Sequence, residues 1–429
     1  MQGKALPGFR DFYPDDLALR NHIFATWRSV AARYGFEEYD GPPLEPLELY
    51  TQKSGEEIVG QLYHFQDKGD RAVALRPEMT PTLARMVGAR AQALKKPIRW
   101  FSIPQLFRYE RQQRGRLREH FQLNMDLIGE AGPLADAELL AAAIDVMRAF
   151  GLGPGDVKAR ISDRRVLRAL LLGHGVAEDQ LATAFVVIDK SEREPHGVLA
   201  DPLTKAGWSR GVVEALFQVA ALRGIGAVSG ALGEIPGGAE VGEPLEQAHA
   251  ALEAMGLSEF VRVDLTIVRG LAYYTGIVFE LFDAAQSLRA ICGGGRYDGL
   301  LKALGGIDLP ALGFGMGDVV LAELLRERQL AAPPARRLDA FLVAVSGEDI
   351  AVTLSLAHRL RDEGMAVEFG LRQQAVRKQL ELASARGAAR AVIIGPEERR
   401  AGEVVVRDLG AGSERRVALA QLEGALRNG

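Results

Sequence analysis

Between Phe107 and Gln122 the chain reads FRYERQQRGRLREHFQ, and the strand patterns on either side of its loop indicate the fold. Residues 98–110, which run into it, have the pattern of a β-strand, and residues 119–129 have the pattern of a second one. A glycine-containing, arginine-rich loop at 111–118 separates them. Strands joined by so short a connection pair antiparallel, so we expect an antiparallel sheet flanked by helices.

The same stretch is strongly basic. Residues 106–120 hold five arginines and two glutamates, a local balance of +3 in a protein whose net charge is −4. An arginine at a strand end, such as Arg108, can bind a phosphate through two parallel hydrogen bonds, and the adjoining basic loop can follow a phosphate backbone. A solvated Arg/Glu hairpin explains the composition equally well.

The overall composition is that of a globular protein. Of the 429 residues 48% are hydrophobic and 25% are charged, which argues against disorder and allows two or three domains. With an acidic net charge, any nucleic-acid surface must be a local basic patch. Cys292 is the only cysteine, so an internal disulfide is excluded and a thiolate zinc site is not expected.

The N-terminal segment and the apolar runs give no sign of secretion or membrane insertion. Residues 1–17 lack the uninterrupted apolar core of a signal peptide. The longest apolar stretches are shorter than a membrane span. We therefore expect a cytoplasmic protein with no membrane partner.

The first part of the chain alternates between helical and extended patterns. Residues 15–35 predict an amphipathic helix ended by Gly35, and the prolines of 36–50 favour an extended segment. Residues 62–75 predict a hairpin, and a helix follows from Pro81 to Leu94. Residues 160–255 are rich in Ala, Leu and Gly and mostly helical, which indicates an inserted domain.

The remaining patterns complete the core and predict a separate C-terminal domain. Strand patterns return at 261–268, 276–283 and 288–292, the last followed by the glycines 293–295, and a helix at 318–328 closes the core. After a linker at 329–336, strands at 339–345, 366–369, 390–394 and 403–407 alternate with helices at 349–363, 373–386 and 418–427. This order predicts a small α/β domain with a largely parallel sheet. The expected domains are a core (1–159 and 256–328), an insertion (160–255), a linker (329–336) and an α/β domain (337–429).

Polar residues share one face of the second strand. Gln122, Asn124 and Asp126 lie on the same side because side chains alternate along a strand. Three polar side chains on one face of a central strand are costly to bury without partners. A pocket for a polar ligand explains them, and so does an exposed face.

Two glycine- or proline-containing segments also carry polar groups. Residues 76–80, RPEMT, place a carboxylate and a hydroxyl where a strand gives way to a helix. Glu78 can bind an ammonium group there, while Thr80 alone is better explained as a helix N-cap. Glycines 293–295 allow close backbone approach to a ligand, but they match neither the dinucleotide fingerprint nor the P-loop.

Residues 268–276, VRGLAYYTG, place Arg269, Tyr273 and Tyr274 at a glycine-bounded bend between strands. Tyrosines in such a bend are usually core aromatics whose hydroxyl reaches water. The arginine is harder to explain structurally, because one apolar strand leads into it and another leads out.

Together these segments resemble the histidyl-tRNA synthetase family of class II aminoacyl-tRNA synthetases, over nearly the whole chain. The matching segments are 8–12 (GFRDF) for the N-terminal signature, 35–42 for motif 1, 107–122 for motif 2, 268–276 and 293–300 for the two histidine-specific motifs, and 393–398 for the C-terminal domain. Other class II ligases lack the two histidine motifs. The resemblance implies a class II core with a helical insertion and a C-terminal α/β anticodon-binding domain.

The resemblance also implies an enzyme that activates L-histidine with ATP and transfers it to tRNA(His), acting as a homodimer formed through motif 1. Mg²⁺ would be bound mainly through ATP, and no metal site of the protein itself is expected. Arg108 and Arg269 would be the catalytic pair at the α-phosphate. Histidine would be bound by Glu78, Met79, Thr80, Arg108, Gln122, Asp126, Arg269, Tyr273 and Tyr274, and ATP by Arg108, Glu110 and Arg116.

Within that set the resemblance gives each side chain a task. Glu78 and Thr80 would hold the α-ammonium group of histidine, and Gln122 would contact its carboxylate side. Asp126 would pair with one imidazole N–H, with Tyr273 and Tyr274 beside it. Glu110 would orient the adenine of ATP.

The chain departs from the family pattern in three places. Ala272 stands where most members carry aspartate. In the segment that resembles motif 3, residues 313–321, Val320 stands where most members have an arginine that binds the γ-phosphate. A branch similar to the organellar plant enzymes shares both forms, so we interpret them as a variant, with Arg289 or Arg296 supplying the clamp. The pair 112–113 replaces a proline-containing version of the motif 2 loop, which leaves open how the acceptor end of the tRNA is recognised.

Two other functions remain open at this point. A non-charging paralogue, such as the regulatory subunit of ATP phosphoribosyltransferase, shares the core fold but normally lacks the anticodon domain and the Arg269 motif. A binding module associated with a tRNA or a kinase would be expected to have lost Arg108, Gln122 or Arg269.

RNA contacts are expected from two regions. Residues 372–390 hold five basic residues and one acidic residue, which are Arg372, Arg377, Lys378, Arg386, Arg390 and Glu381. This stretch would lie near the anticodon, although a solvated helix face explains it equally well. The 160–255 insertion would contact the acceptor stem.

Overall fold

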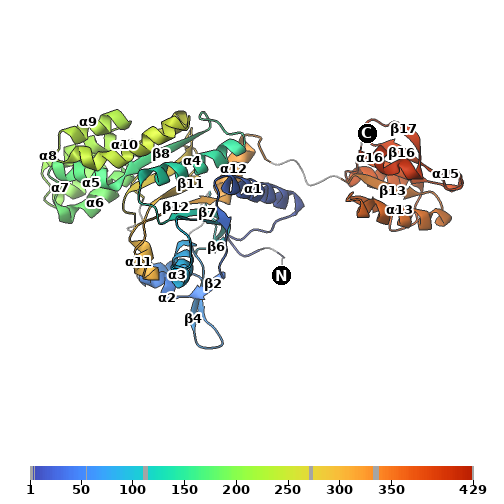
Figure 1. Cartoon of the computed structure of the whole chain (residues 1–429), viewed down its shortest axis with the longest axis horizontal. Helices are drawn as coiled ribbons and strands as arrows, with labels where there is room; N and C mark the ends of the chain where they lie inside the picture. Colours follow the sequence, from blue (N-terminus) through green and yellow to red (C-terminus); the bar gives the residue numbers. More distant parts are fainter. Residues whose placement is uncertain are drawn as a thin grey trace. The chain divides into compact units, whose positions relative to one another are not determined.

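The computed structural model divides the chain into two compact units, Met1–Ala332 and Pro333–Gly429 (Figure 1). It describes residues 3, 5–54, 56–109, 115–269, 274–331 and 338–427, with the backbone alone at 52–54 and 56–58. The predicted linker at 329–336 lies largely outside these residues.

The first unit is built on one sheet, whose strands follow the order β1-β5-β7-β12-β11-β10-β8-β9, with β6 paired to β7. These strands are β1 (Glu37–Glu38), β5 (Ile98–Ser102), β6 (Gln105–Phe107), β7 (Glu119–Ile128), β8 (Val157–Asp163), β9 (Val261–Val263), β10 (Ile277–Asp283), β11 (Cys292–Arg296) and β12 (Ala311–Gly317). From β5 to β8 neighbours are antiparallel, whereas the edge pairs β1–β5 and β8–β9 are parallel. The predicted class II core is confirmed, with a mixed rather than purely antiparallel sheet.

Helices and a small second sheet surround this core. α1 (Pro14–Arg33) starts with Pro14 and two aspartates, and it stops before Gly35, whose φ of 72° favours glycine. The predicted hairpin 62–75 belongs to the small sheet, of order β2-β4-β3. The further elements are β2 (Leu44–Pro46), α2 (Glu48–Ser54), η1 (Glu56–Gln61), β3 (His64–Gln66), β4 (Ala72–Leu75), α3 (Thr80–Arg90), α4 (Pro133–Ala149), α11 (Leu300–Gly305) and α12 (Asp318–Glu327).

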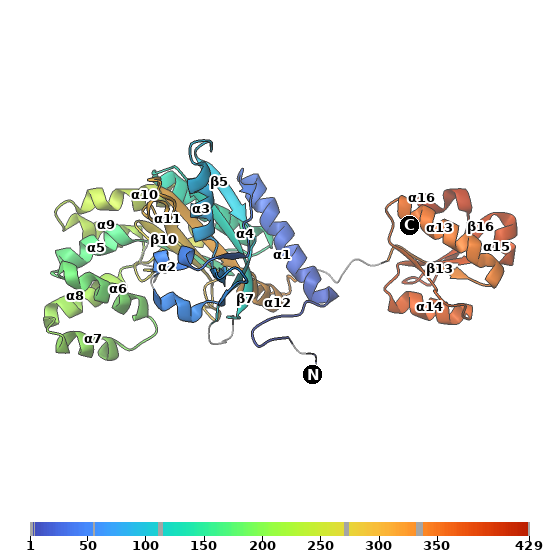
Figure 2. The ribbon, with the colours of Figure 1, turned by 90° about the horizontal axis from the view of Figure 1, so that it is seen from below.

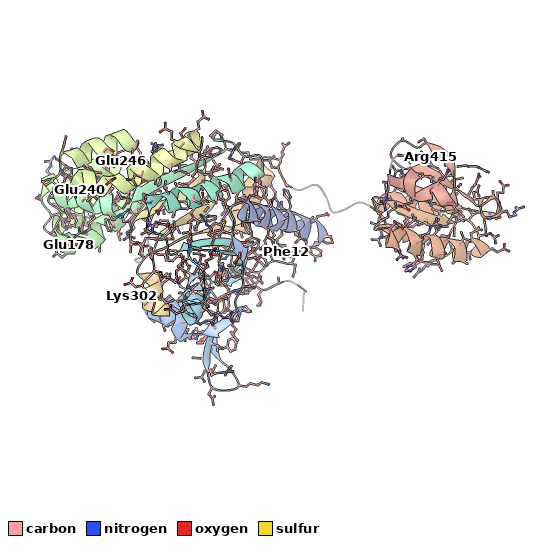
Figure 3. The ribbon with its side chains drawn as sticks, in the orientation of Figure 1. Phe12, Glu178, Glu240, Glu246, Lys302 and Arg415 are labelled. Carbon is pink, nitrogen blue, oxygen red and sulfur yellow. The ribbon has the colours of Figure 1, made fainter. Side chains whose placement is uncertain are left out.

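A helical insertion follows β8 and lies beyond that edge of the sheet, away from α1 (Figure 2). It comprises α5 (Arg164–Gly173), η2 (Glu178–Gln180), α6 (Leu181–Lys190), α7 (His196–Lys205), α8 (Arg210–Ala221), α9 (Ile225–Gly233), α10 (Gly238–Ala254) and η3 (Ser258–Phe260). Glu178, Glu240 and Glu246 are exposed on its outer surface (Figure 3). The expected boundary at 160 falls inside β8, which pairs with β10 along its whole length.

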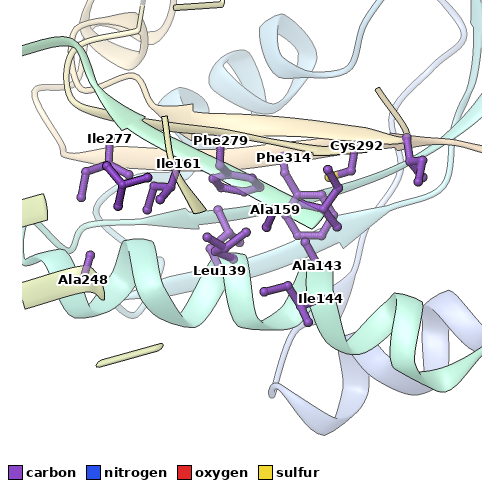
Figure 4. Close-up of a cluster of buried hydrophobic side chains, with 14 of the residues drawn as sticks. Leu139, Ala143, Ile144, Ala159, Ile161, Ala248, Ile277, Phe279, Cys292 and Phe314 are labelled. Carbon is purple, nitrogen blue, oxygen red and sulfur yellow. The ribbon is translucent and has the colours of Figure 1, made fainter. Parts of the chain in front are cut away.

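One face of the main sheet packs on α4 and forms the core. Phe279 of β10 and Phe314 of β12 lie close to Leu139 and Ala143 of α4 (Figure 4). All four are at most 4% exposed. Burying apolar side chains of this size contributes roughly 1.5–3 kcal/mol each, so this face fixes the register of the strands.

The opposite face of the sheet carries polar side chains next to an apolar cluster that contains Ile98, Ile128 and Val278. Gln122, Asn124 and Asp126 of β7 lie on it, as the two-residue period predicted, while Leu123 and Met125 point into the core. On the neighbouring strand β12 their partners are Gly317, Gly315 and Gly313. We call this side of the sheet the polar face.

Three predicted elements are wrong in detail. The glycines 293–295 lie inside strand β11 rather than after a strand at 288–292, because their missing side chains leave room for groups on both faces of the sheet. The strand at 98–110 is broken between β5 and β6 at Ile103 and Pro104, since proline has no N–H for the ladder. The helix expected at 418–427 begins later, because residues 414–418 pair with β16 as a strand.

The second unit is a small α/β domain with sheet order β14-β13-β15-β16-β17. Its elements are β13 (Ala340–Ala344), η4 (Gly347–Asp349), α13 (Ile350–Asp362), β14 (Val367–Phe369), α14 (Val376–Ala385), β15 (Arg390–Ile394), α15 (Pro396–Ala401), β16 (Glu403–Asp408), β17 (Glu414–Ala418), η5 (Leu419–Gln421) and α16 (Leu422–Arg427). β14, β13 and β15 are parallel, and β16 and β17 continue the sheet antiparallel. Across the described ranges of the whole chain, every helix is too short or too polar to cross a membrane.

Candidate active site

A cavity of about 800 Å³ opens on the polar face. Its lining comes from segments far apart in the chain: motif 2, the strands β10 to β12, the start of α12 and the insertion. Of the predicted site residues, Arg108, Arg116, Gln122 and Arg269 line it. The predicted catalytic pair, Arg108 and Arg269, therefore shares one cavity.

Glycines on β11 and β12 make room for the polar side chains. A Cβ added at Gly293 would overlap the Arg269 guanidinium, and one at Gly313 would overlap the Asp126 carboxylate. At Gly315 it would stand 2.7 Å from Cδ of Gln122. Glycine weakens a strand, so its repetition here follows from close approach of functional groups.

Arg269 has a strained backbone and a fixed side chain. Its φ is 53°, in the left-handed region that non-glycine residues seldom occupy, and such strain clusters at functional sites. Its Nη1 donates to Oε1 of Glu280 at 2.9 Å, and its guanidinium lies 5.7 Å from the centre of the Tyr274 ring. The side chain thus stands over Gly293 with its charge directed into the cavity.

Arg108, Arg116 and Arg289 bring three positive charges to the same cavity. Arg108 Nε donates to the carbonyl of Pro77 at 2.9 Å. Burial lowers the pKa of the Arg116 guanidinium, and the nearby charges of Arg108 and Arg289 lower it further. Like charges held this close are stabilised by an anion, so the cluster suits a polyphosphate.

Asp126 and Tyr297 form a buried pair on the polar face. Tyr297 donates its hydroxyl to Oδ1 of Asp126, which is 4% exposed. Burial raises the pKa of Asp126 to about 7, although the hydrogen bond from Tyr297 lowers it. The described lining of the cavity does not include Asp126, which lies on the same face of β7 four residues after Gln122.

His120 is a cavity residue that sequence reasoning missed. It is half-buried and lies on β7 one alternation before Gln122. Burial, with Arg108, Arg10 and Arg116 nearby, lowers the pKa of His120 to about 3. The imidazole is therefore neutral at physiological pH. The alternation that predicted the polar face extends to position 120 and was the available signal.

Arg10 ties the N-terminal signature to motifs 2 and 3. Its Nε donates to Glu119 at 2.6 Å and its Nη1 to Asp318 at 2.9 Å. Asp318 also accepts the Phe121 backbone N–H at 2.9 Å. Charge-assisted bonds of this kind fix the start of β7 against the start of α12, and both segments contribute residues to the cavity lining.

The insertion also reaches the cavity, which the sequence did not reveal. Asp189, Glu192 and Arg193, at the end of α6 and just after it, are among the lining residues. Glu192 accepts hydrogen bonds from the guanidinium of Arg160 on β8, and Asp264 accepts one from Arg160 Nε at 2.8 Å. Arg160 thereby joins the insertion to the sheet beside the cavity.

Other predicted residues lie elsewhere. Met79 is buried, Thr80 opens α3, and neither they nor Glu78 belong to the described cavity lining. Tyr274 is 8% exposed and packs in the apolar cluster that also contains Tyr297. Two predicted contacts fall outside the described residues, namely Glu110 and Tyr273, and so does Ala272.

Arg296 is not available as a replacement clamp, so that half of the hypothesis is wrong. The side chain is 4% exposed and is paired with Asp136. It also donates to the carbonyl of Glu130 at 3.0 Å. These acceptors compensate the charge of the Arg296 guanidinium, which would be costly to bury without a partner. Arg289, by contrast, lines the cavity together with Val320.

In the second unit the basic stretch 372–390 is partly committed to internal contacts. Arg377 pairs with Glu381 and Arg386 with Glu368, while Arg390 donates to the carbonyl of Leu426. A pocket of about 250 Å³ opens beside it at the ends of β13 and β14, with Arg372 in its lining.

Comparison with known proteins places the chain in one family. A family model described as histidyl-tRNA synthetase matches residues 8–318, and one described as an anticodon binding domain matches 339–429. The histidine–tRNA ligase of Opitutus terrae is 46% identical over 431 residues, covering 99% of this chain and 98% of its own length. The chloroplastic/mitochondrial histidine–tRNA ligase of Arabidopsis thaliana is 41% identical over 416 residues, covering 97% and 85%.

The fold agrees with these matches. The crystal structure of histidyl-tRNA synthetase from Nostoc sp. PCC 7120 superposes with a TM-score of 0.86 at 25% identity, covering 100% of this chain and 99% of that one. The anticodon-domain match disfavours the non-charging paralogue. The chain belongs to the histidyl-tRNA synthetase family of class II aminoacyl-tRNA synthetases, and the predicted activity, that of a histidine–tRNA ligase, is confirmed.

Proposed function

We propose that the cavity on the polar face activates histidine with Arg108 and Arg269 as its catalytic residues. The carboxylate oxygen of histidine attacks the α-phosphorus of ATP in line, the bond to the bridging oxygen breaks, and pyrophosphate leaves with that electron pair. Negative charge builds up on the phosphoryl oxygens during this step. Two fixed guanidinium groups stabilise it without having to reorganise.

The single observation that carries this proposal is the meeting of Arg108 and Arg269 in one cavity with Gln122. The guanidinium of Arg269 packs against Gly293, in the space that a side chain would fill there, and it donates a hydrogen bond to Glu280. Arg108 is held by the Pro77 carbonyl. Both guanidinium groups are thus oriented before a substrate enters, which is the condition for electrostatic catalysis.

For the amino acid, we assign the imidazole to Asp126. Its carboxylate accepts one ring N–H, while Tyr297 fixes the carboxylate from the other side. Tyr274, and Tyr273 next to it in the chain, would complete this pocket, with Gln122 toward the carboxylate of the substrate. Glu78 and Thr80 would take the α-ammonium group, with Met79 packed beneath them, and Glu110 and Arg116 would serve ATP.

In the second step, a hydroxyl of the terminal ribose of tRNA(His) attacks the carbonyl carbon of the histidyl-adenylate. The ester bond forms, the bond between the acyl carbon and the phosphate oxygen breaks, AMP leaves with that electron pair, and the hydroxyl proton passes to solvent. We assign the acceptor stem to the insertion, because residues such as Glu192 already border the cavity. The anticodon is assigned to the C-terminal domain.

Mg²⁺ is expected to arrive with ATP. Within the described ranges there is no group of three or more His, Cys, Asp or Glu side chains suited to hold a metal ion. We therefore propose that phosphate oxygens are its main ligands. The ion would neutralise charge on the departing pyrophosphate.

Two further properties complete the proposal. Motif 1, residues 35–42, would form a homodimer, which sedimentation velocity tests directly. The protein would act in the cytoplasm, although one relative is named for chloroplasts and mitochondria.

Histidine-dependent ATP–pyrophosphate exchange tests the assignment of the catalytic pair. Arg108→Ala and Arg269→Ala should each lower kcat by about 10²–10³, the effect of removing one donor to developing charge. Arg168→Ala is the matched control, because it removes an arginine paired with Glu178 on the insertion, outside the cavity lining. Near-normal exchange by both cavity variants would remove the proposed roles.

A further inference from the structure

Arg289 reaches the same point of the cavity as Val320. A Cβ built on Gly115 would lie 3.7 Å from Cδ of Arg289 and 3.3 Å from Cγ2 of Val320. Both side chains line the cavity, one from the bend before β11 and the other from the first turn of α12. The bend and the helix start are linked, since the Gly317 N–H donates to the Ile291 carbonyl at 3.3 Å.

The bend that carries Arg289 is held in shape by a buried carboxylate. Asp283 is 2% exposed, and its two oxygens accept the backbone N–H groups of Ser287 and Leu288, each at 2.9 Å. The hydroxyl of Ser287 donates to it as well, at 2.9 Å. Arg289 directly follows this turn, so the turn fixes the direction in which its side chain leaves the backbone. A side chain fixed in this way loses less conformational entropy when it binds an anion.

The three arginines of the cluster differ in depth. Arg108 and Arg116 are half-buried, whereas Arg289 is exposed, at the mouth of the cavity. The charges of Arg108 and Arg289 both lower the pKa of Arg116, so the three guanidinium groups are close enough to interact. A triphosphate whose reacting phosphorus lies at Arg108 and Arg269 would extend toward solvent, and its last phosphate would come to the outermost cation.

We propose that Arg289 binds the terminal phosphate of ATP and the departing pyrophosphate, a task that the uncharged Val320 cannot perform from the adjacent position. This assignment rests on the proposed histidine activation. Because Arg289 would contact only the β- and γ-phosphates, its removal should weaken binding of ATP and pyrophosphate. A general role in the fold or in histidine binding would instead affect every substrate.

The test compares two half-reactions of Arg289→Ala. In histidine-dependent exchange the KM values for ATP and for pyrophosphate should rise about 10- to 100-fold, as expected for a lost charged hydrogen bond, while the KM for histidine stays within about twofold. Transfer of histidine from preformed adenylate to tRNA in a single turnover should proceed at the normal rate, because that intermediate has no β- or γ-phosphate. Arg71→Ala is the control for both half-reactions, because Arg71 is an exposed arginine paired with Asp67 outside the cavity lining and outside the insertion.

A relocation experiment sharpens the test. Val320→Arg introduced into Arg289→Ala should recover most of the affinity for ATP and pyrophosphate, since both side chains approach the same point. Unchanged KM values in Arg289→Ala, an equal loss in the transfer step, or no recovery on relocation would each overturn the assignment. Absence of histidine-dependent exchange in the unaltered protein would instead refute the proposed activation step, so the two failures are distinguishable.

Discussion

Replacing Gly293 by alanine adds one methyl group beneath the guanidinium of Arg269. The new carbon would overlap Cζ and Nη1 and would stand 3.0 Å from Nη2. β11 is paired on both sides, with β10 and with β12, so the strand has little freedom to yield. The guanidinium must move instead, away from Glu280, which it contacts at 2.9 Å, and away from the position proposed for the α-phosphate.

The substitution should lower kcat strongly and should change the free energy of unfolding little. A cationic donor displaced from developing charge costs about 10²–10³ in kcat, roughly 3–4 kcal/mol. The partly exposed pair between Arg269 and Glu280 is worth only about 1 kcal/mol after solvent screening. The change to alanine stabilises the strand by about 0.5–1 kcal/mol, because glycine loses more backbone entropy than alanine on folding. This gain offsets most of the lost ion pair. The melting temperature should therefore shift by at most a few degrees.

Histidine-dependent ATP–pyrophosphate exchange measures the change in kcat, and a thermal melt measures the change in stability. Gly299→Ala is the matched control, since an added Cβ there meets nothing within 4 Å. The double variant Gly293→Ala/Arg269→Ala should be no slower than Arg269→Ala, because the methyl group acts only through the guanidinium. Wild-type exchange by Gly293→Ala, or effects that multiply in the double variant, would refute the reasoning.

Three other predictions follow from buried groups. Because burial raises the folded-state pKa of Asp126 to about 7, its contribution to stability is full below the unfolded value near 3.9 and is lost as pH rises through about 7. Asp126→Asn should therefore stabilise the protein more at pH 8 than at pH 5 in urea melts, and a pH-independent difference would contradict this. Arg10→Ala leaves Glu119 and Asp318 buried without that cation and should cost about 3–5 kcal/mol in denaturant unfolding, against a smaller loss for Arg10→Lys. Burial raises the pKa of the Cys292 thiol, so a thiol reagent should react only after unfolding, and rapid labelling of the native protein would count against the buried position.

Local periodicity was sufficient to predict the polar face. Along β7, Gln122, Asn124 and Asp126 alternate with Leu123 and Met125, and the observed pairing with β12 bears this out. The period of two is imposed by backbone geometry, so it needs no knowledge of the partner strand. The same alternation also carries His120, which the prediction did not include.

The glycine-rich strand could not be predicted in the same way. Glycine is depleted in strands, so the run 293–295 favours a loop on propensity alone. Its reason lies in other segments: Arg269 stands over Gly293, and Phe314 with the Gly313 carbonyl closes on Gly294 from β12. Helix α4 presents the converse difficulty, since most of its positions from Ala135 to Met147 are buried and no polar face marks its orientation.

The ion pairs that hold the site together depend on register and not on local sequence. Arg10 meets Glu119 and Asp318 across separations of 109 and 308 residues, and no spacing rule connects such positions. Once the sheet is formed, however, Gln122, Asn124 and Asp126 on β7 are each paired with a glycine on β12. An added Cβ at Gly313 or Gly315 would enter the space that Asp126 or Gln122 occupies, so the site and the register of the sheet depend on each other. A larger residue at Gly313 or Gly315 should therefore disturb substrate binding before it disturbs the core, because the opposite, apolar face still fixes the strands.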